Sequence, residues 1–554
     1  VFVCHCGINI GGVVNVPGVK EYAASLPNVV YVDENLYTCS QDTQELIKDK
    51  IKEYNLNRVI VASCTPRTHE PLFQETLQEQ GLNKYLFEMA NIRDQCSWVH
   101  QQHPEEATKK AKDLVRMAVA KVRGLEPLKM ISLETVPSAL VVGGGIAGMV
   151  STLNLADQGF SVSLVEKGMN LGGMARKIHY TLEGGDVQTY LKELMEKVNN
   201  HPLINVYTKA SIAESSGYIG NFVTKIQVGP KKEITEIKHG AVIIATGGEE
   251  YKTKEYFYKK NSRVLSLLDL EAEIIKRSKK IKECKNLVMI QCVGSRDDER
   301  PYCSRVCCSE SIKCAILLKD INPEANIYIL YRDIRTYGLK EDFYREAREK
   351  GIIFIHYEPD AKPEVVPYKE SGKEGLRVSV KDPLLGEQVI IDADLLALAI
   401  ATTPPSTNKE LSQFFKVPLN EDKFFLEAHM KLRPVEFATD GVFMCGLAHN
   451  PKLIEESIAQ AQAAASRAGM ILSRKLVQLP GVISFVNKNK CIGCGECASV
   501  CPFGAVTLDE KQHLAVVNDA LCKGCGICSA SCKSGAINLY GFSNSQVVSM
   551  IDSL

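Results

Sequence analysis

The chain has 554 residues, 45% of them hydrophobic, and its 66 basic residues balance 66 acidic ones. This length allows three or four domains with buried cores, and the balanced charge gives no sign of a polyanion or an anionic membrane as a partner. No apolar run reaches the roughly 18–20 residues of a membrane-spanning helix, and no secretory signal follows Val1, so a cytoplasmic protein is expected.

Twenty cysteines are the most unusual feature of the composition. They gather at short spacings in a chain that otherwise alternates strand-like and helix-like segments, as intracellular α/β proteins do. Thiols in such a compartment stay reduced unless they hold metal or serve redox chemistry. Metal or redox centres are therefore expected in preference to structural disulfides.

Residues 1–134 contain four strand-like runs, such as VVYVDENLYT at 29–38, and predict an N-terminal α/β domain. Each run leads into one or two cysteines, and the carboxyl ends of parallel strands share one edge of a sheet. Several thiolates at one edge favour a metal centre, although some can be small buried core residues. Only one of the two cysteines after the first strand is expected to be a ligand. We predict a [4Fe–4S] cluster held by four of Cys4, Cys6, Cys39, Cys64 and Cys96.

Residues 135–260 begin with a nucleotide-binding pattern. The strand SALVV is followed by Gly143-x-Gly145-x-x-Gly148, a helical stretch and a second strand that ends at Glu166. In this order the glycines let the turn approach a pyrophosphate at the helix N-terminus, and the acid can accept hydrogen bonds from a ribose. The alternative is a glycine turn that packs a βαβ unit without a cofactor.

Two later stretches distinguish FAD from NAD. HGAVIIATGG at 239–248, and a strand, turn and long helix at 440–468, resemble segments of the thioredoxin reductase group of flavoproteins. In that group the last helix points its N-terminus at the flavin ring. Gly446 and Leu447 stand where the group has Gly-Asp, so its usual carboxylate at the ribityl chain is absent. The resemblance implies that residues 395–478 complete the FAD-binding domain and that FAD is bound by Gly143, Gly145, Ile146, Ala147, Gly148, Glu166, Lys167, Gly172, Gly173, Ala245, Thr246, Gly247, Gly446, Lys452 and Ile454.

In that group a second dinucleotide-binding domain is inserted into the first, and residues 261–394 take its place here. The strand NLVMIQC at 286–292 should lead into a second glycine fingerprint, but a short loop and a run of cysteines follow. A helix at 304–321 and the strand NIYILYRDI keep the βαβ frame, while the pyrophosphate cradle is lost. Electrons are therefore expected to reach the flavin through a cluster and not from a nicotinamide.

The cysteines of this insert surround the start of its helix. Three fall near the first turn, and a fourth ends the preceding strand at the same edge of the sheet. Helix N-terminal N–H groups favour an anionic cluster there, as they would a phosphate. We predict a [4Fe–4S] cluster held by Cys292, Cys303, Cys307 and Cys308, and packing roles for Cys284, Cys314 and Cys445.

Lys313 lies on the same helix, five residues after Cys308. A cation there could stabilise a reduced, anionic flavin and shift its one-electron potentials, which makes Lys313 a candidate catalytic residue. The alternative is a solvated surface lysine.

Residues 479–541 predict a ferredoxin domain, followed by a tail at 542–554. They contain C-x2-C-x2-C-x3-C twice, a spacing in which three close thiolates hold one cluster and the fourth reaches the other. Lys533 replaces the usual proline after the second motif but is not a ligand. Two zinc knuckles are the alternative. We predict one [4Fe–4S] cluster on Cys491, Cys494, Cys497 and Cys532, and another on Cys501, Cys522, Cys525 and Cys528.

The chain resembles the A-type component of heterodisulfide reductase over nearly its whole length. The resemblance rests on CHCGINIGG, ASCTPRTHEPLF, NIRDQCSWVH, QCVGSRD with YCSRVCC, YRDIRTYG and the twin ferredoxin motif, in this order. It implies an α/β fold class: a thioredoxin-reductase-like core of two Rossmann domains, with the N-terminal cluster domain and the C-terminal ferredoxin domain. Some members insert a further ferredoxin module after the ATGG stretch, and this chain resembles the short form without it.

This resemblance implies an electron-transfer subunit with FAD and four [4Fe–4S] clusters. Its partners would be B- and C-type subunits that reduce the CoM–S–S–CoB heterodisulfide in methanogens, a hydrogenase or formate dehydrogenase as donor, and ferredoxin, within a complex that contains it as a homodimer. The flavin of the family bifurcates electron pairs between the heterodisulfide and ferredoxin. Neither nucleic acid nor a transmembrane segment is implied.

Two other classes of function compete with this interpretation. One is a stand-alone NAD(P)H or disulfide oxidoreductase, which the missing second glycine fingerprint and the missing C-x2-C or C-x4-C pair beside the flavin disfavour. The other is a non-bifurcating relay or assembly subunit in a sulfur- or quinone-linked complex.

Overall fold

The computed structural model describes residues 1–370, 373–479 and 481–554, and its contacts divide the chain into two compact units. One unit joins the two ends of the chain, Val1–Leu133 and Gln478–Leu554, and the other is Glu134–Val477. The chain passes from one unit to the other within strands β5 (Ile131–Glu134) and β24 (Leu476–Leu479). Among the described helices, none combines the length and the apolar character that crossing a membrane requires.

The N-terminal part of the first unit is a parallel sheet with strand order β2-β1-β3-β4. Strand β3 is buried at every position, because its sequence VIVAS is small and mostly apolar. Ala107, Ala111, Val115 and Val122 share one face of helix α4 and pack into the core beside this sheet. The elements are β1 (Phe2–Cys4), α1 (Val16–Ala24), β2 (Asp33–Asn35), α2 (Gln41–Glu53), β3 (Val59–Ser63), α3 (Pro66–Glu79), β4 (Phe87–Asn91) and α4 (Pro104–Arg123).

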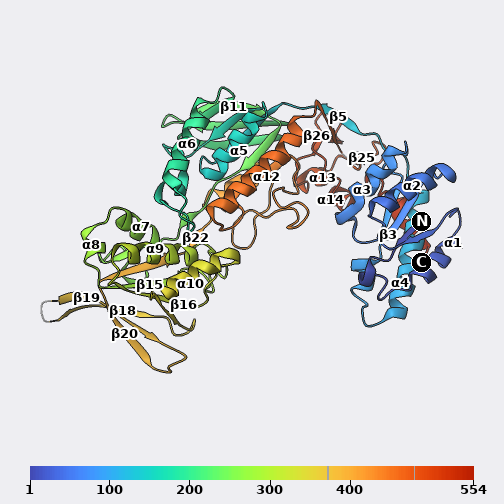
Figure 1. Ribbon diagram of the computed structural model, residues 1–554. Coiled ribbons are helices and arrows are strands. Elements are labelled where there is room, and N and C mark those ends of the chain that lie inside the picture. The colour runs from blue at the N-terminus through green and yellow to red at the C-terminus, as the bar shows by residue number, and fades with distance from the viewer. Residues whose placement is uncertain (371–372, 480) are drawn as a thin grey trace. The chain divides into compact units, whose positions relative to one another are not determined.

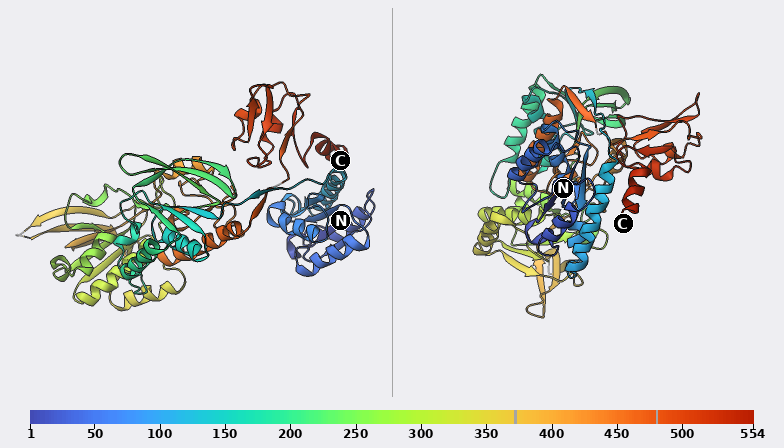
Figure 2. Two further views of the ribbon diagram at one scale, coloured as in Figure 1. Left: turned by 90° about the horizontal axis from the view of Figure 1, so that it is seen from above. Right: turned by 90° about the vertical axis from the view of Figure 1, so that its right-hand side faces the viewer.

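The C-terminal part of the same unit consists of two short antiparallel strand pairs and two short helices, α13 and α14, and it ends in a longer helix, α15. Gly495 and Gly526 precede the two short helices with φ of 80° and 78°, in the left-handed region that favours glycine. The last helix packs against α4, and Gln546 Nε2 donates to Gly124 O at 2.7 Å, so both chain ends belong to this unit (Figures 1 and 2). The elements are β25 (Ser484–Val486), α13 (Glu496–Ser499), β26 (Val506–Asp509), β27 (Leu514–Val517), α14 (Ile527–Ser531), β28 (Ile537–Leu539) and α15 (Asn544–Asp552).

The second unit contains a five-stranded parallel sheet of order β23-β12-β6-β7-β8. Alternate residues of its strands point to opposite faces: helices α5 and α12 pack on one face, and the antiparallel strands β9, β10 and β11 cover the other with Phe222, Ile226 and Ile237. The elements are β6 (Ser138–Val142), α5 (Ile146–Asp157), β7 (Ser161–Val165), α6 (Val187–Asn200), β8 (Ile204–Tyr207), β9 (Ala210–Tyr218), β10 (Asn221–Val228), β11 (Glu233–His239), β12 (Ala241–Ile244), β13 (Glu249–Glu250), β22 (Thr402–Thr403), α11 (Asn408–Phe415), β23 (Val442–Met444) and α12 (Ile454–Leu472).

The inserted segment forms a second parallel sheet, of order β14-β21-β15-β16-β17, and β21 (Leu395–Ile400) extends this sheet beyond residue 394, where the sequence predicts the insert to end. Helices α7 and α9 pack into the core on one face, and the antiparallel sheet β18-β19-β20 packs on the other, as Figure 1 shows. The elements are β14 (Val264–Ser266), α7 (Leu267–Ile275), α8 (Lys279–Lys282), β15 (Asn286–Val293), α9 (Cys307–Ile321), β16 (Asn326–Tyr331), α10 (Glu341–Glu349), β17 (Ile353–His356), β18 (Glu364–Glu370), β19 (Lys373–Lys381), β20 (Gln388–Ala393) and β21 (Leu395–Ile400).

Two predicted element boundaries are wrong. The helix expected from residue 304 begins at Cys307, because Arg305 has a φ of 59° and cannot belong to a right-handed helix. The strand expected over 29–38 is only Asp33–Asn35, since its short partner β1 offers three residues for pairing.

Candidate flavin and iron–sulfur sites

The glycine turn between β6 and α5 has the geometry of a dinucleotide-binding loop. Gly143 has a φ of 114°, and a Cβ there would lie 2.2 Å from Ala245 O, so this position requires glycine. Glu166 follows β7 and accepts hydrogen bonds from the N–H groups of Gly144, at 2.7 Å, and Gly168, at 2.5 Å. Each carboxylate oxygen keeps a second lone pair, which can accept from a ribose hydroxyl.

A cavity opens beside this turn. All the residues predicted to bind FAD line it except Gly148 and Gly446. A Cβ on Gly148 would lie 1.8 Å from Gly143 O, and one on Gly446 would lie 2.7 Å from Ala147 Cβ, so these two glycines permit the close packing behind the turn. The sequence did not predict the following further lining residues as FAD ligands: Met174, Leu268, Val306, Glu310, Leu447, Leu453 and Ser457.

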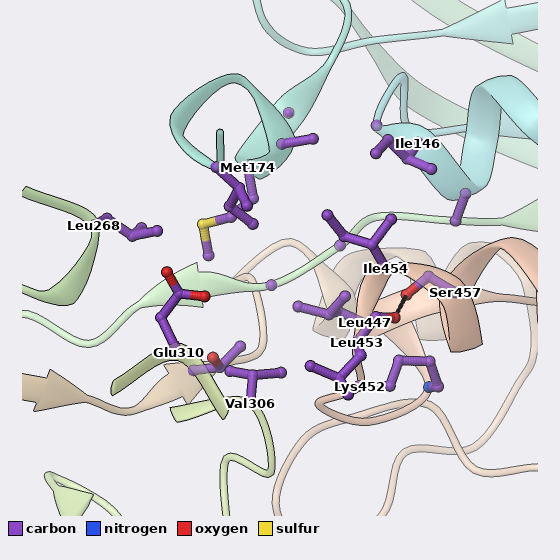
Figure 3. A pocket seen from close by; sticks show the side chains of 18 of the residues that line it. Ile146, Met174, Leu268, Val306, Glu310, Leu447, Lys452, Leu453, Ile454 and Ser457 are labelled. Atoms are coloured by element: carbon purple, nitrogen blue, oxygen red, sulfur yellow. Dashed lines mark hydrogen bonds between the residues drawn. The ribbon is translucent and has the colours of Figure 1, made fainter. Parts of the chain in front are cut away.

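Figure 3 shows apolar side chains on opposite sides of this cavity. Met174 and Leu268 lie on one side, and Leu453 and Ile454, at the start of α12, lie on the other. A pocket of apolar walls beside a glycine turn suits a planar ring joined to a pyrophosphate. These residues therefore fit a flavin dinucleotide.

Lys452 brings a buried cation to the same cavity. Its Nζ donates to Gly446 O at 2.7 Å and to Asn450 O at 3.0 Å. Burial lowers the pKa of Lys452 to about 7, and nearby Arg305 acts in the same direction. Helix α12 begins two residues later and adds the partial positive charge of its N-terminus. Lys452 and the helix N-terminus thus bring positive charge to this end of the cavity, beside the acids Glu455 and Glu456 of the first turn of α12.

The four predicted ligand cysteines of the insert lie together. Cys292 ends the regular part of β15 with a φ of 61°, and its pKa is raised by burial and then by the Cys308 thiol. A hydrogen bond with Cys308 and burial raise the pKa of Cys307, and Cys292 and Cys303 add to the shift. The backbone N–H of Arg305 donates to Cys303 Sγ at 3.3 Å. Buried thiols grouped in this way can be held as thiolates by a metal centre.

The cysteine group and the cavity share a wall at the start of α9. Cys307, the first residue of this helix, lines the cavity, as do Ser309 and Glu310. Figure 3 shows Val306 and Glu310 at the insert side of the cavity. A flavin in the cavity and a cluster on the cysteines would therefore be neighbours.

Three other cysteines are packing residues, as predicted. Cys284 and Cys314 belong to the hydrophobic core beneath α9, and Cys445 belongs to the core between α5 and α12.

Lys313 is buried, so the alternative of a solvated surface lysine is wrong. Its Nζ lies 2.6 Å from Glu310 Oε1 and 2.9 Å from Glu271 Oε1, and it donates to Tyr180 O at 2.9 Å. Lys313 does not itself line the cavity, whereas Glu310 and Tyr180 do. Any influence of Lys313 on a bound flavin therefore has to pass through these neighbours.

At the N-terminal sheet edge, the structure brings together Cys4, Cys6, Cys39 and Cys64. Burial raises the pKa of Cys39, and the thiols of Cys4 and Cys6 raise it further. Burial also raises the pKa of Cys64, with smaller contributions from Cys39 and Cys4, while Arg93 opposes it. Cys4 and Cys6 thus both lie in the group, whereas the sequence predicts only one of them as a ligand.

Cys96 is separated from this group. It lies in a π-helical turn, Arg93–Ser97, after β4. Its Sγ donates to Ala107 O of α4 at 2.8 Å, and its side chain is fully buried in the core beneath that helix. The expected convergence of all five N-terminal cysteines is therefore wrong for Cys96.

The C-terminal cysteines form the two groups expected from their spacing. One hollow is lined by all four cysteines assigned to the second cluster. In the first group, the pKa of Cys497 is raised by burial and then by Cys491, Cys528 and Cys532. Backbone N–H groups that donate to cluster sulfurs are one means by which proteins tune such sites. They donate here from Ser484 to Cys522 at 3.3 Å, from Ala505 to Cys501 at 3.3 Å and from Ala515 to Cys491 at 3.5 Å.

Among the described residues, no three cysteine, histidine or acidic side chains are arranged to hold a single metal ion. A [4Fe–4S] cube separates its ligand sulfurs more widely than one ion does, and the repeated cysteine spacing is the one that suits such cubes.

Comparison with protein families gives two matches. Residues 484–539 match the family described as 4Fe-4S dicluster domain, and residues 141–207 match the NAD(P)-binding Rossmann-like domain. Together with the two parallel sheets of the second unit, these matches confirm the predicted fold class.

Relatives match over nearly the whole chain. The chain is 38% identical over 92% of its length to an A-type iron-sulfur component of CoB–CoM heterodisulfide reductase from Methanopyrus kandleri, and covers 91% of that protein. It is 35% identical over 100% of its length to the corresponding A-type iron-sulfur component from Methanocaldococcus jannaschii, covering 98%. Among solved structures, Lactococcus lactis thioredoxin reductase is 16% identical with a TM-score of 0.42, over 61% of this chain and 99% of that one.

The alignment with the Methanopyrus protein extends over 602 positions, more than the 554 residues of this chain. That relative therefore carries residues that this chain lacks. The shared length and the identity nevertheless leave the family unambiguous. The chain belongs to the family of A-type heterodisulfide reductase components, the iron–sulfur flavoproteins of an oxidoreductase, as its motifs predicted.

Proposed function

We propose that this chain is an FAD- and iron–sulfur-containing electron-transfer subunit of a heterodisulfide reductase-type complex, and that its flavin bifurcates electron pairs. Its cofactors are one FAD and four [4Fe–4S] clusters. Its partners are B- and C-type subunits, a hydrogenase or formate dehydrogenase-type donor and ferredoxin, and it acts as a homodimer within the complex. The names of relatives include H(2), formate and ferredoxin, which supports these partners.

The observation that carries the proposal is the shared wall between the flavin cavity and the insert cysteine group. Cys307 belongs to both. A cluster held there would neighbour a flavin in the cavity, which would suit exchange of single electrons. When bound, the flavin supplies the conversion between two-electron and one-electron steps. The chain contributes apolar walls, the helix N-terminus and Lys452 to its surroundings.

A nicotinamide site is disfavoured by the loop that follows β15. Arg300 Nε donates to Gly294 O at 2.6 Å, and its guanidinium lies 4.0 Å from the ring centroid of Tyr251. The N–H of Arg296 donates to Tyr302 O at 3.1 Å. The loop thus closes on itself where a pyrophosphate would need free N–H groups. This supports electron delivery through the cluster and not by hydride transfer from NAD(P)H.

Exposed apolar side chains beside the N-terminal cysteine group provide a surface for the B- and C-type subunits. The loop after β1 carries the most exposed of them, and its Gly7 lies against the hydroxyl of Tyr37. On its other side, Ser97 Oγ donates to Asn9 O at 2.6 Å. Clustered exposed apolar residues mark protein contact sites. This docking surface comprises Ile8 (86% exposed), Leu36 (61%), Tyr37 (49%), Trp98 (52%) and Val99 (61%).

The decisive experiment is the double variant Cys307→Ser/Cys308→Ser in the anaerobically purified complex. We expect it to lose about four of about 16 iron atoms per chain, on the stoichiometry of four cubes, while FAD stays bound. Flavin reduction through the partner subunits should stall, and with it the coupled reduction of ferredoxin and heterodisulfide.

Cys314→Ala, on the same helix but in the hydrophobic core, is the matched control and should keep its iron. A Cys307→Ser/Cys308→Ser protein with full iron content and unchanged flavin reduction would contradict the proposal. Ferredoxin and heterodisulfide reduced independently of one another would point to a non-bifurcating relay instead.

A further inference from the structure

Three arginines surround the cysteine group of the insert. The guanidinium groups of Arg296 and Arg335 lie 2.6 Å and 3.5 Å from the Asp333 carboxylate, and the backbone carbonyl of Asp333 lies 3.7 Å from Cys308 Sγ. Arg332 follows β16 and donates from Nη1 to the backbone carbonyl of Arg296 at 2.7 Å. The three side chains therefore come from the two loops that border the cysteines.

The charge of this arrangement is not balanced. The guanidinium groups of Arg296 and Arg335 share one carboxylate, that of the half-exposed Asp333. Arg332 Nε is buried and has no hydrogen-bond partner among the described residues. Burial raises the pKa of the Cys292 thiol, and the guanidinium groups of Arg296 and Arg332 oppose this shift.

The N-terminal cysteine group differs in this respect. Arg93 is its neighbouring arginine, and Asp94 lies 3.0 Å from Arg93 Nε. That cation is thus paired with an acid, while the insert retains an excess of positive charge next to its thiols.

We propose that Arg296, Arg332 and Arg335 are positioning residues that raise the reduction potential of the insert cluster. The proposal rests on the cluster assigned under the proposed function. Reduction adds a negative charge to an already anionic cube, and burial beside an apolar cavity opposes that addition. Nearby cations favour the reduced state, and they act strongly where water is excluded. The arginines offset the effect of burial and keep the cluster reducible by its neighbour.

The test is an EPR-monitored redox titration of the intact complex. The signal of the insert cluster is the one that disappears in Cys308→Ser. In Arg296→Gln/Arg335→Gln we expect the ratio of reduced to oxidised cluster at a fixed potential to fall at least about tenfold, which corresponds to about 59 mV for a one-electron couple. Arg296→Lys/Arg335→Lys retains both charges and should keep a potential close to that of the wild type.

Arg345→Gln is the control, because Arg345 is exposed on α10 and pairs with Asp342 away from the cysteines. The single variant Arg335→Gln changes a side chain that is 47% exposed, so it tests the inference even if the double variant misfolds. It should shift the reduction potential in the same direction. If the EPR signal of the insert cluster is present in both Gln variants and its reduction potential is unchanged, this inference is overturned while the proposed function stands. If the reduction potential in Arg296→Lys/Arg335→Lys is as low as in the Gln variants, the charge of the arginines is not the cause. If Cys308→Ser loses neither an EPR signal nor iron, these cysteines hold no cluster. That result would overturn both the proposed insert cluster and this inference.

Discussion

Lys313 Nζ lies 2.9 Å from Glu271 Oε1, and the two side chains are 3% and 0% exposed. Glu310 Oε1 lies 2.6 Å from the same nitrogen, so one ammonium group faces two carboxylates. Glu271 Oε1 also accepts from the N–H groups of His179 and Tyr180, each at 3.0 Å. The network joins helices α7 and α9 of the insert to the loop of the FAD-binding part that contains Tyr180.

Removal of this lysine should weaken the fold before it affects any chemistry. Lys313→Ala leaves two buried acids without their cation, and breaking a buried pair in this way costs about 3–5 kcal/mol of unfolding free energy. Urea unfolding followed by circular dichroism measures the loss. Lys279→Ala, at an exposed lysine of α8, should change the unfolding free energy by less than about 0.5 kcal/mol. Equal unfolding midpoints for Lys313→Ala and the wild type would show that the network contributes nothing to stability.

Sequence spacing predicted the sites best where ligands are close together in the chain. The glycine turn at Gly143 and the repeated C-x2-C-x2-C-x3-C spacing each define a local backbone shape, so the structure places their residues as expected. The cysteine group of the insert could also be predicted from the sequence, because a strand end and a helix start at one sheet edge place Cys292 near Cys307.

Sites that depend on side-chain direction or on distant partners were less predictable. A strand end does not determine where a cysteine five residues later will point, and the π-helical turn directs Cys96 to Ala107. The surroundings of Lys313 depend on Glu271 of another helix, which helical periodicity at α9 cannot reveal. Met174 lies in the 3-10 turn Gly173–Lys177 and Leu268 in the first turn of α7, and no distinctive sequence pattern marks either of them as a cavity residue.

His239 should make the stability of the second unit depend on pH. Its ring is buried and stacks on Phe222, Nδ1 donates to Ala241 O at 3.1 Å, and Nε2 accepts from Thr224 Oγ1 at 2.9 Å. Burial lowers its pKa from 6.5 to about 4. Between these values the unfolded chain binds a proton that the folded chain does not, so the unfolding free energy falls as the pH falls, by at most about 1.4 kcal/mol per unit.

Urea unfolding at several pH values between 5 and 7 tests this effect of His239. His239→Gln should be less stable at neutral pH but show a flatter dependence on pH over this range. His429→Gln, at an exposed histidine of the same unit, should follow the wild type. Parallel curves for His239→Gln and the wild type would assign the pH dependence to other groups.

Nicotinamides should not reduce the flavin. The loop closed by Arg300 and Gly294 leaves no pyrophosphate cradle after β15, so NADH or NADPH at micromolar concentration should leave the flavin absorbance unchanged in a stopped-flow experiment. Dithionite in the same experiment should bleach it and so demonstrate a reducible flavin. Rapid bleaching by either nicotinamide would favour a stand-alone NAD(P)H oxidoreductase.

The separation of Cys96 from the N-terminal cysteine group can be tested with two matched substitutions. Cys39→Ala removes a thiol that interacts with Cys4 and Cys6, so we expect the loss of one cluster, about four iron atoms. Cys96→Ala removes a thiol that is buried against Ala107, so the iron content should stay complete. Its cost should be one hydrogen bond and a small cavity, about 1–2 kcal/mol of unfolding free energy. Iron analysis and urea unfolding of the two anaerobically purified variants separate these outcomes. Loss of iron from Cys96→Ala with full iron in Cys39→Ala would exchange the two roles, and it would require the π-helical turn to open so that Cys96 could reach the edge of the sheet.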